Sequence, residues 1–256
     1  MPEALPLIAA RHFQCRFLLE LLTPPASLTY TVCMTWKTLP PWLPYVAPFA
    51  LFLLLTTPEG HVPPAAFPLA YAVKIALVGG LVIALRGYFP EARPGGGGWA
   101  AATVLGVVLG VSWAWVDMHT PHFPKLFGTR TGFNPNREIA TAAGIVFFLF
   151  VRFLGLVVVV PIVEELFYRG FLLRFVSDMD DFRRVPVGTF SALALGVNVI
   201  LFALSHPEWL AAAIFALAQC LLLRGTRNLF ACILAHGVTN LLLGVYILHT
   251  GQWQYW

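Results

Sequence analysis

The sequence predicts an all-α protein, a polytopic transmembrane helical bundle with about seven to eight membrane helices. Three observations predict this class. Hydrophobic residues make up 59% of the chain, charged residues make up 11% where a soluble domain has roughly 25%, and the apolar residues occur in long runs. So few charges could not cover a soluble fold of 256 residues. The composition therefore excludes a disordered chain, a coiled coil and a cytosolic enzyme.

The first three expected spans lie in the N-terminal half. The run 42–57 begins with Trp42 and Tyr45, aromatic residues of the kind that anchor a helix at a membrane interface. The runs 65–85 and 99–116 follow, and a flexible glycine-rich linker separates them. The first run is short, and all three runs are apolar and are interpreted as membrane helices.

The apolar stretch 138–176 is expected to contain one break, at Pro161. Proline has no backbone N–H and clashes with the preceding turn, so a kink or restart should divide the stretch into spans 139–160 and 161–176. This block could cross the membrane once or twice, which leaves the helix count between seven and eight. Three further spans are expected at 187–205, 207–223 and 228–248.

Residues 1–37 are mixed in composition and are expected to form an N-terminal extension, with Met34 as a possible true start. The integral membrane domain is expected at 38–256. Basic residues gather in one set of loops, which by the positive-inside rule predicts a cytoplasmic N-terminus. That set contains ten residues, Arg11, Arg16, Lys37, Arg86, Arg93, Arg174, Arg183, Arg184, Arg224 and Arg227, against three in the other, Lys125, Arg130 and Arg137. The net charge of +4 forms no basic stripe, so no nucleic-acid partner is expected.

One apolar run carries adjacent carboxylates. Ionisable groups at membrane depth are costly, so each is a functional candidate. On a helix, Glu164 and Glu165 point about 100° apart. Glu165 and Arg169 are four residues apart with the acid first, the favourable order for an ion pair. Glu164 is then left to face a cavity as a general base.

Two later segments add further polar groups. His206 ends an apolar run, four residues after Phe202. His236 and Asn240 are also four residues apart, so they share one helix face. A carboxylate, two imidazoles and an amide that converge in an apolar bundle would form a hydrolytic site. The carboxylate and one histidine can deprotonate a water, while the other histidine and the amide can donate to an oxyanion.

The ordered pattern Glu-Glu-x-x-x-Arg, Phe-x-x-x-His and His-x-x-x-Asn resembles the CAAX protease and bacteriocin-processing (Abi) family of intramembrane proteases. The motifs here are Glu164-Glu165-x-x-x-Arg169, Phe202-x-x-x-His206 and His236-x-x-x-Asn240. The segment 42–50 and the short chain also resemble the bacterial CAAX prenyl protease-related branch.

The resemblance implies a CAAX-type glutamic endopeptidase in a bacterial inner membrane. Glu164 and His206 would activate the water, and His236 and Asn240 would form the oxyanion site. Supporting roles would fall to Glu165, Arg169 and Phe202. The implied partners are the lipid bilayer and a membrane-associated protein or peptide substrate, whether lipid-modified or membrane-anchored. The resemblance does not identify that substrate.

Two other functions remain open at this point. A zinc-dependent membrane protease could use His206, His236 and Glu164 as ligands, but no His-Glu-x-x-His motif is present and Asn240 fits an oxyanion donor better. We therefore expect no metal and no cofactor. A non-catalytic membrane scaffold or immunity protein could use the same polar cluster for binding.

The remaining polar and sulfur-containing residues favour structural roles. The pair His119-x-x-His122 is expected to be solvated rather than metal-binding, and Arg152 and Lys74 are expected to snorkel or to brace the bundle. No cysteine pair has CxxC spacing, so all four cysteines are expected to be apolar filler or free thiols. They are Cys15, Cys33, Cys220 and Cys232.

Overall fold

A computed structural model describes residues 39–121 and 132–255, and in these ranges the chain is helical without any strand. This confirms the all-α class. The predicted extension 1–37 and the possible start at Met34 lie outside the described residues. The helices are α1 (Leu43–Glu59), α2 (Phe67–Leu85), α3 (Trp99–Met118), α4 (Pro135–Glu138), α5 (Ala142–Leu154), α6 (Val160–Glu165), α7 (Leu173–Ser177), α8 (Ala192–Leu204), α9 (Trp209–Thr226) and α10 (Leu229–Thr250).

Five helical segments in the described part of the chain are long and apolar enough to cross a membrane, so the chain is an integral membrane protein. They are Pro64–Tyr88, Trp99–Met118, Ala142–Ser177, Trp209–Thr226 and Leu229–Thr250. Two more apolar helices, α1 and α8, are shorter. The predicted count of seven to eight is therefore not confirmed, because α1 and α8 are short and the stretch around Pro161 is one helix.

The predicted break at Pro161 is wrong. Helix Ala142–Ser177 is continuous over 36 residues. It contains two wider π-helical turns, the first π segment (Gly155–Val159) and the second π segment (Leu166–Leu172). The first π segment ends shortly before Pro161. Around it the backbone N–H groups bond to the carbonyl five residues earlier, as the Val160 N–H does with Gly155. The N–H that Pro161 lacks therefore does not stop the helix.

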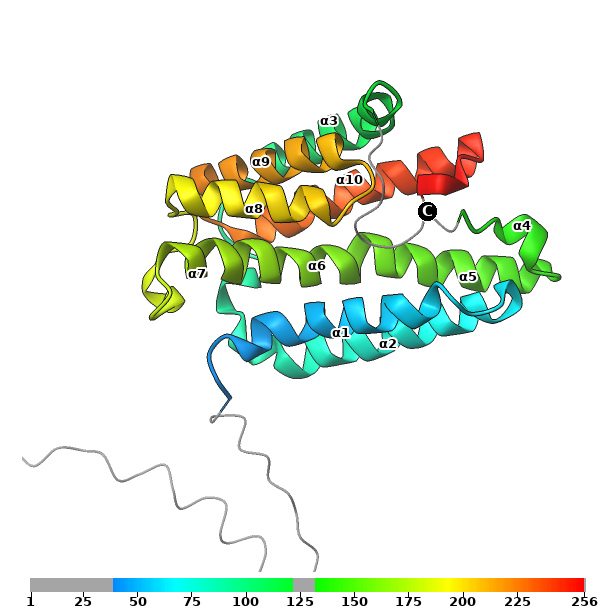
Figure 1. Ribbon diagram of the computed structural model, residues 1–256, viewed down its shortest axis with the longest axis horizontal. Helices are drawn as coiled ribbons and strands as arrows, with labels where there is room; N and C mark the ends of the chain where they lie inside the picture. Colours follow the sequence, from blue (N-terminus) through cyan, green and yellow to red (C-terminus); the bar gives the residue numbers. More distant parts are fainter. Residues whose placement is uncertain (1–38, 122–131, 256) are drawn as a thin grey trace, which may run out of the picture. The chain divides into compact units, whose positions relative to one another are not determined.

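This long helix divides the bundle (Figure 1). Helices α1 and α2 lie on one side of it, and α3, α8, α9 and α10 lie on the other. Helix α3 packs closely against α10, because Gly106 and Gly110 leave no room for a side chain. A Cβ atom at Gly106 would lie 2.8 Å from the Val238 Cβ, and one at Gly110 would lie 2.9 Å from the Leu242 Cβ. Small residues at such contacts are typical of membrane helix pairs.

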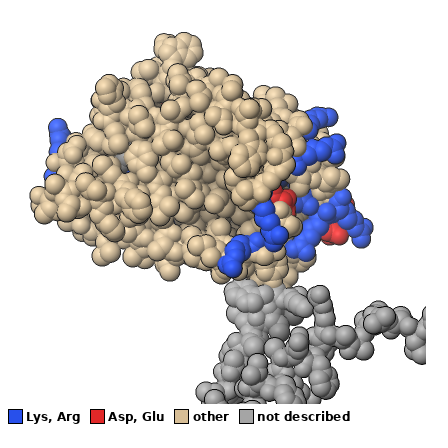
Figure 2. Space-filling view, turned by 180° about the vertical axis from the view of Figure 1, so that it is seen from behind, with Lys and Arg blue, Asp and Glu red and all other residues tan. Residues whose placement is uncertain are grey.

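Charged side chains are absent from most of the face in Figure 2, and the lysines and arginines visible there gather mainly at one end. The broad uncharged band fits contact with lipid acyl chains. Arginines in the loops after α2, α7 and α9 are exposed, namely Arg86, Arg93, Arg183, Arg184 and Arg227.

A buried cation braces the bundle away from the motifs. Lys74 of α2 is 4% exposed and forms an ion pair with Glu59 of α1, which confirms the bracing role expected for it. The Arg152 guanidinium lies 4.6 Å from the centre of the Tyr71 ring, so this arginine also joins two helices. The thiols of Cys220 and Cys232 are free and buried, as expected, whereas Cys15 and Cys33 lie outside the described residues.

Candidate active site

The two adjacent glutamates sit at the end of α6, between the π segments, and differ in their surroundings as predicted. Glu165 is fully buried, and Glu164 is 8% exposed and lines a cavity. One atom of each carboxylate, Oε2, has no hydrogen-bond partner within the described part of the chain. A buried carboxylate oxygen without a donor is costly, so the unpaired oxygen of Glu164 at the cavity is a candidate for function.

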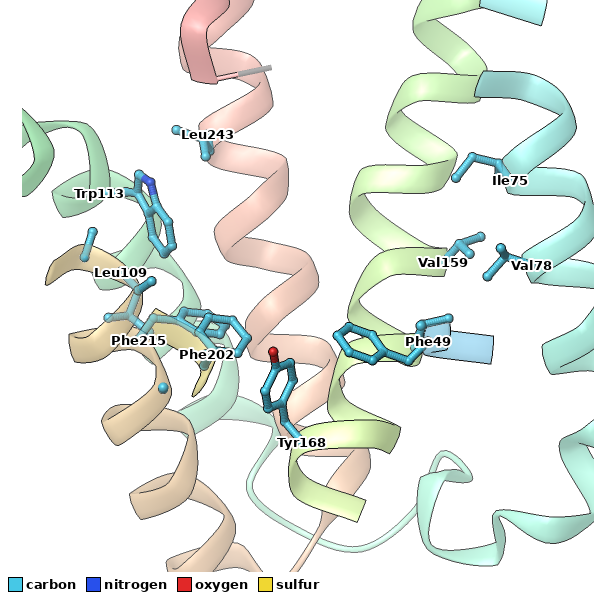
Figure 3. Packing of buried hydrophobic residues seen from close by; sticks show 14 of the residues in the cluster. Phe49, Ile75, Val78, Leu109, Trp113, Val159, Tyr168, Phe202, Phe215 and Leu243 are labelled. Atoms are coloured by element: carbon cyan, nitrogen blue, oxygen red, sulfur yellow. The ribbon is translucent and has the colours of Figure 1, made fainter. Parts of the chain in front are cut away.

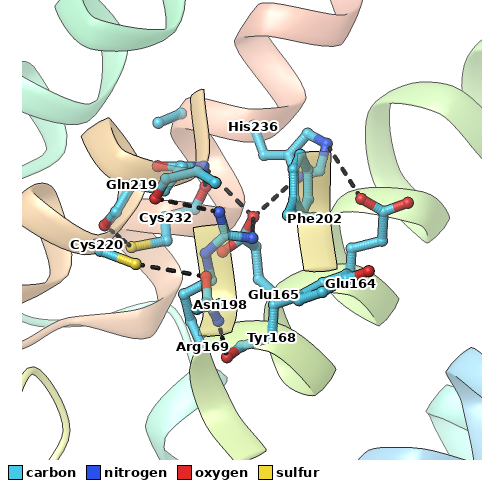
Figure 4. A network of polar contacts seen from close by, with 12 residues as sticks. Glu164, Glu165, Tyr168, Arg169, Asn198, Phe202, Gln219, Cys220, Cys232 and His236 are labelled. Carbon is cyan, nitrogen blue, oxygen red and sulfur yellow. Dashed lines mark hydrogen bonds and ion pairs between the residues drawn. The ribbon is translucent and has the colours of Figure 1, made fainter. Parts of the chain in front are cut away.

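Three donors converge on Oε1 of Glu165 (Figure 4). The Arg169 Nη1 donates over 3.3 Å, the His236 Nδ1 over 2.9 Å and the Gln219 Nε2 over 3.4 Å. The predicted ion pair between Glu165 and Arg169 is therefore confirmed. The guanidinium carbon of Arg169 lies 4.7 Å from the centre of the Phe202 ring, so this buried cation also contacts an aromatic face. This network holds Glu165 behind the cavity rather than in it.

His236 bridges the two glutamates. Its Nδ1 bonds to Glu165, and its Nε2 lies 4.0 Å from Oε2 of Glu164, a separation too long for a direct hydrogen bond. Figure 4 shows the imidazole between the two carboxylates. The Phe215 ring packs edge-on against the imidazole at 4.7 Å between ring centres, which limits its rotation.

The motif Phe202-x-x-x-His206 has a direct structural basis at the end of α8. His206 Nδ1 lies 2.9 Å from the Phe202 carbonyl oxygen, and the imidazole stacks on the Phe202 ring with 4.5 Å between centres. A carbonyl oxygen can only accept, so Nδ1 carries the proton of the neutral ring and Nε2 is left as an acceptor. An imidazole in this tautomer can bind a water proton at Nε2.

Asn240 is held by the first π segment. Val160 N–H donates to the Gly155 carbonyl, so the next donor in this pattern would be Pro161, which has no N–H. The Asn240 Nδ2 donates instead to the carbonyl oxygen of Leu156, at 2.9 Å. This bond uses one of the two amide hydrogens, and the second remains available to another acceptor.

The side chains of Glu164, His206, His236 and Asn240 border one cavity of about 140 Å³. It has room for several water molecules, which a polar lining can hold. All four predicted catalytic residues and Phe202 line it, while Glu165 and Arg169 lie outside its lining. The lining residues are Trp113, Leu156, Val160, Glu164, Phe202, His206, Glu208, Phe215, His236, Asn240, Leu243 and Tyr255. The arrangement can hold a water next to a carboxylate and an imidazole.

No group of three or more His, Cys, Asp and Glu side chains that could hold a metal ion occurs in ranges 39–121 and 132–255. His206, His236 and Glu164, the ligands suggested for zinc, therefore do not form a metal-binding group in the described residues. His119 contacts the Trp115 carbonyl through Nδ1 at 2.7 Å, and His122 lies outside the described residues.

Sequence reasoning missed three polar groups of the site. Gln219 and Asn198 are fully buried, and Glu208 lines the cavity. Asn198 donates to the carbonyl oxygen of Tyr168 over 2.7 Å and so fixes the second π segment. The rule that found the glutamates, a polar side chain in an apolar membrane helix, would also have found Gln219 and Asn198.

Residues 144–242 match a family model described as type II CAAX prenyl endopeptidase Rce1-like. This segment is an Rce1-like domain of the CAAX protease family. The resemblance found in the three motifs is thereby confirmed, and all of their residues lie within the matched segment. Neither the curated proteins nor the solved structures include a significant match to the chain. An Rce1-like domain implies a protease, and the apolar helices place this protease in a membrane.

Proposed function

We propose that the Rce1-like domain is an intramembrane endopeptidase in which Glu164 and His206 activate a water for attack on a peptide bond. One observation carries the proposal. The Glu164 Oε2 is buried, lacks a hydrogen-bond partner among the described residues and lines the same cavity as His206, His236 and Asn240. A general base needs this combination of an available lone pair and a site that can hold a water.

In the proposed reaction, Glu164 accepts a proton from the water, whose oxygen bonds to the substrate carbonyl carbon. Nε2 of His206 accepts a hydrogen bond from the same water and orients it. The peptide C–N bond then breaks as Glu164 returns the proton to the leaving amine. Atoms balance in this sequence without a cofactor.

The oxyanion formed on attack needs donors. The second N–H of Asn240 is one, since the first is bonded to Leu156. An imidazolium at His236 would be another, with Nδ1–H donating to Glu165 and Nε2–H donating to the oxyanion. Fixed donors of this kind stabilise the transition state because they are oriented before charge develops.

The proposal extends to the setting of the enzyme. The membrane domain would span 38–256 with its catalytic core at about 140–248, in a bacterial inner membrane with the N-terminus in the cytoplasm. The substrate would be a membrane-associated protein or peptide, lipid-modified or membrane-anchored. Lysines and arginines gather mainly at one end of the bundle in Figure 2, and exposed arginines occur in the loops after α2, α7 and α9, which supports this orientation.

The test compares purified wild-type protein with Glu164→Gln. Three probes are used, namely a peptide library from membrane proteins, a farnesylated peptide with a CAAX terminus and its unmodified counterpart, and products are identified by mass spectrometry. Glu138→Gln is a matched control, because that glutamate is exposed outside the cavity. We expect cleavage by Glu164→Gln to be at least about a hundredfold slower than by the wild-type protein, and cleavage by Glu138→Gln to be as fast as by the wild-type protein. Undiminished cleavage by Glu164→Gln, or no cleavage by the wild-type protein, contradicts the proposal.

Metal analysis of the same preparation addresses the zinc alternative. Stoichiometric zinc that is removed by a chelator together with activity would contradict the metal-free mechanism. A Glu164→Gln variant that loses cleavage but keeps the cellular phenotype would instead favour the scaffold or immunity function.

A further inference from the structure

A chain of hydrogen bonds leads from the second π segment to His206. The Tyr168 hydroxyl donates to the Ser205 Oγ at 3.3 Å. The Ser205 hydroxyl in turn donates to the Phe202 carbonyl oxygen at 2.7 Å and lies 3.0 Å from the His206 Nδ1. These contacts join residues 37 positions apart in the sequence.

The direction of each bond follows from the groups involved. A serine hydroxyl has one hydrogen and two acceptor lone pairs. When Tyr168 donates to Oγ and the hydroxyl hydrogen points at the Phe202 carbonyl, the remaining lone pair of Ser205 can only accept from Nδ1–H. Both neighbours of Nδ1 are then acceptors, which fixes the proton of His206 on Nδ1.

Tyr168 is itself rigidly placed. Its side chain is 3% exposed, and its carbonyl oxygen accepts a hydrogen bond from the Asn198 amide at 2.7 Å. Its ring packs edge-on against the rings of Phe202 and Phe49, at 5.0 Å and 5.4 Å between centres. Figure 3 shows the tyrosine between these two rings. A hydroxyl held in this way has little freedom to choose another partner.

We propose that Tyr168 is a positioning residue that holds His206 in the Nδ1–H tautomer by acting through Ser205. Without the tyrosine hydroxyl, the Ser205 hydroxyl is free to rotate and donate to Nδ1. The imidazole proton then moves to Nε2 in part of the molecules, and this nitrogen can no longer accept a hydrogen bond from the water. The kinetic consequence rests on the proposed function, whereas the tautomer itself does not.

The hydrogen-bond chain from Tyr168 to His206 predicts an unusual order of activities among the variants. Tyr168→Phe should lower kcat by about three- to tenfold, the effect of roughly one hydrogen bond, and should leave KM unchanged. Ser205→Ala should be close to wild type in kcat, because the Phe202 carbonyl still holds Nδ1–H and no competing donor remains. The double variant should therefore recover the activity lost in Tyr168→Phe. If both residues served only packing, the two losses would add instead.

The experiment measures kcat and KM on the best-cleaved probe peptide, with Tyr71→Phe as the control. Tyr71 is equally buried, and its hydroxyl donates to a backbone carbonyl away from the cavity. Nitrogen-15 NMR of histidine-labelled protein, with the His206 signals assigned from His206→Gln, reports the tautomer without any substrate. A mixed tautomer in Tyr168→Phe and a single Nδ1–H form in the double variant support the proposal.

Unchanged tautomer and kcat in Tyr168→Phe overturn the positioning role of Tyr168, and so does a double variant less active than Tyr168→Phe. These results differ from failure of the proposed function, which shows as cleavage that persists in Glu164→Gln. If no probe is cleaved, the NMR measurement decides alone, since an unchanged tautomer in Tyr168→Phe still refutes the proposal.

Discussion

Replacement of Arg169 by methionine should destabilise the protein more than any surface substitution. Both side chains of its ion pair with Glu165 are 0% exposed, so Arg169→Met leaves a carboxylate without its cation in an apolar interior. Removal of one partner of a buried ion pair destabilises by about 3–5 kcal/mol. Loss of the Nη2 bond to the Ala216 carbonyl and of the contact with Phe202 acts in the same direction. This is a large part of a typical stability of about 5–15 kcal/mol.

Equilibrium unfolding in detergent micelles measures this change. Arg184→Met is the matched control, because its pair with Asp181 has side chains 78% and 42% exposed, and such a pair contributes about 0–1 kcal/mol. Glu165→Gln/Arg169→Met should be less destabilised than Arg169→Met, since no uncompensated charge remains. If Arg169→Met costs no more than Arg184→Met, the claim that this pair supports the site is refuted.

Three other predictions concern the helices that carry the site. Gly237→Ala places a Cβ atom 2.8 Å from the Val157 carbonyl oxygen and should destabilise by about 1–3 kcal/mol in unfolding experiments, whereas Gly196→Ala, with open space around it, should not. Pro161→Ala restores a helical N–H that competes with Asn240 for Leu156; we expect kcat to fall with no loss of melting temperature, and unchanged kcat would contradict this link. Ser205→Ala leaves the buried Tyr168 hydroxyl without its acceptor, so thermal melts should show it to be less stable than Tyr168→Phe/Ser205→Ala, and the reverse order would disprove the contact.

The features predicted correctly from the sequence are mostly local. The pair of Glu165 and Arg169 follows from a spacing of four on one helix, and the different surroundings of Glu164 follow from the 100° step about the helix axis. The gathering of His206, His236 and Asn240 at one cavity was expected from three ordered motifs and agrees with the structure. The first two inferences needed only helical periodicity, whereas the third also needed the order of the three motifs along the chain.

The features that escaped prediction depend on contacts between helices. The sequence around Pro161 predicts a break, because a proline disrupts a helix that has no neighbours to compensate for the lost hydrogen bond. In the structure, a π turn and the Asn240 amide compensate for the missing N–H. The link from Tyr168 to Ser205 joins two helices, and no spacing along the chain indicates it.

The two π segments have a consequence for the depth of the catalytic carboxylates. One backbone carbonyl oxygen in each π segment, on either side of the two glutamates, accepts a hydrogen bond from a side-chain amide. Leu156 accepts from Asn240 of α10, and Tyr168 accepts from Asn198 of α8. Since main-chain atoms make these bonds, the long helix can neither slide along its axis nor turn without losing them. Its apolar, lipid-facing side chains can therefore be exchanged for others while the carboxylates stay at the same height between the two membrane surfaces.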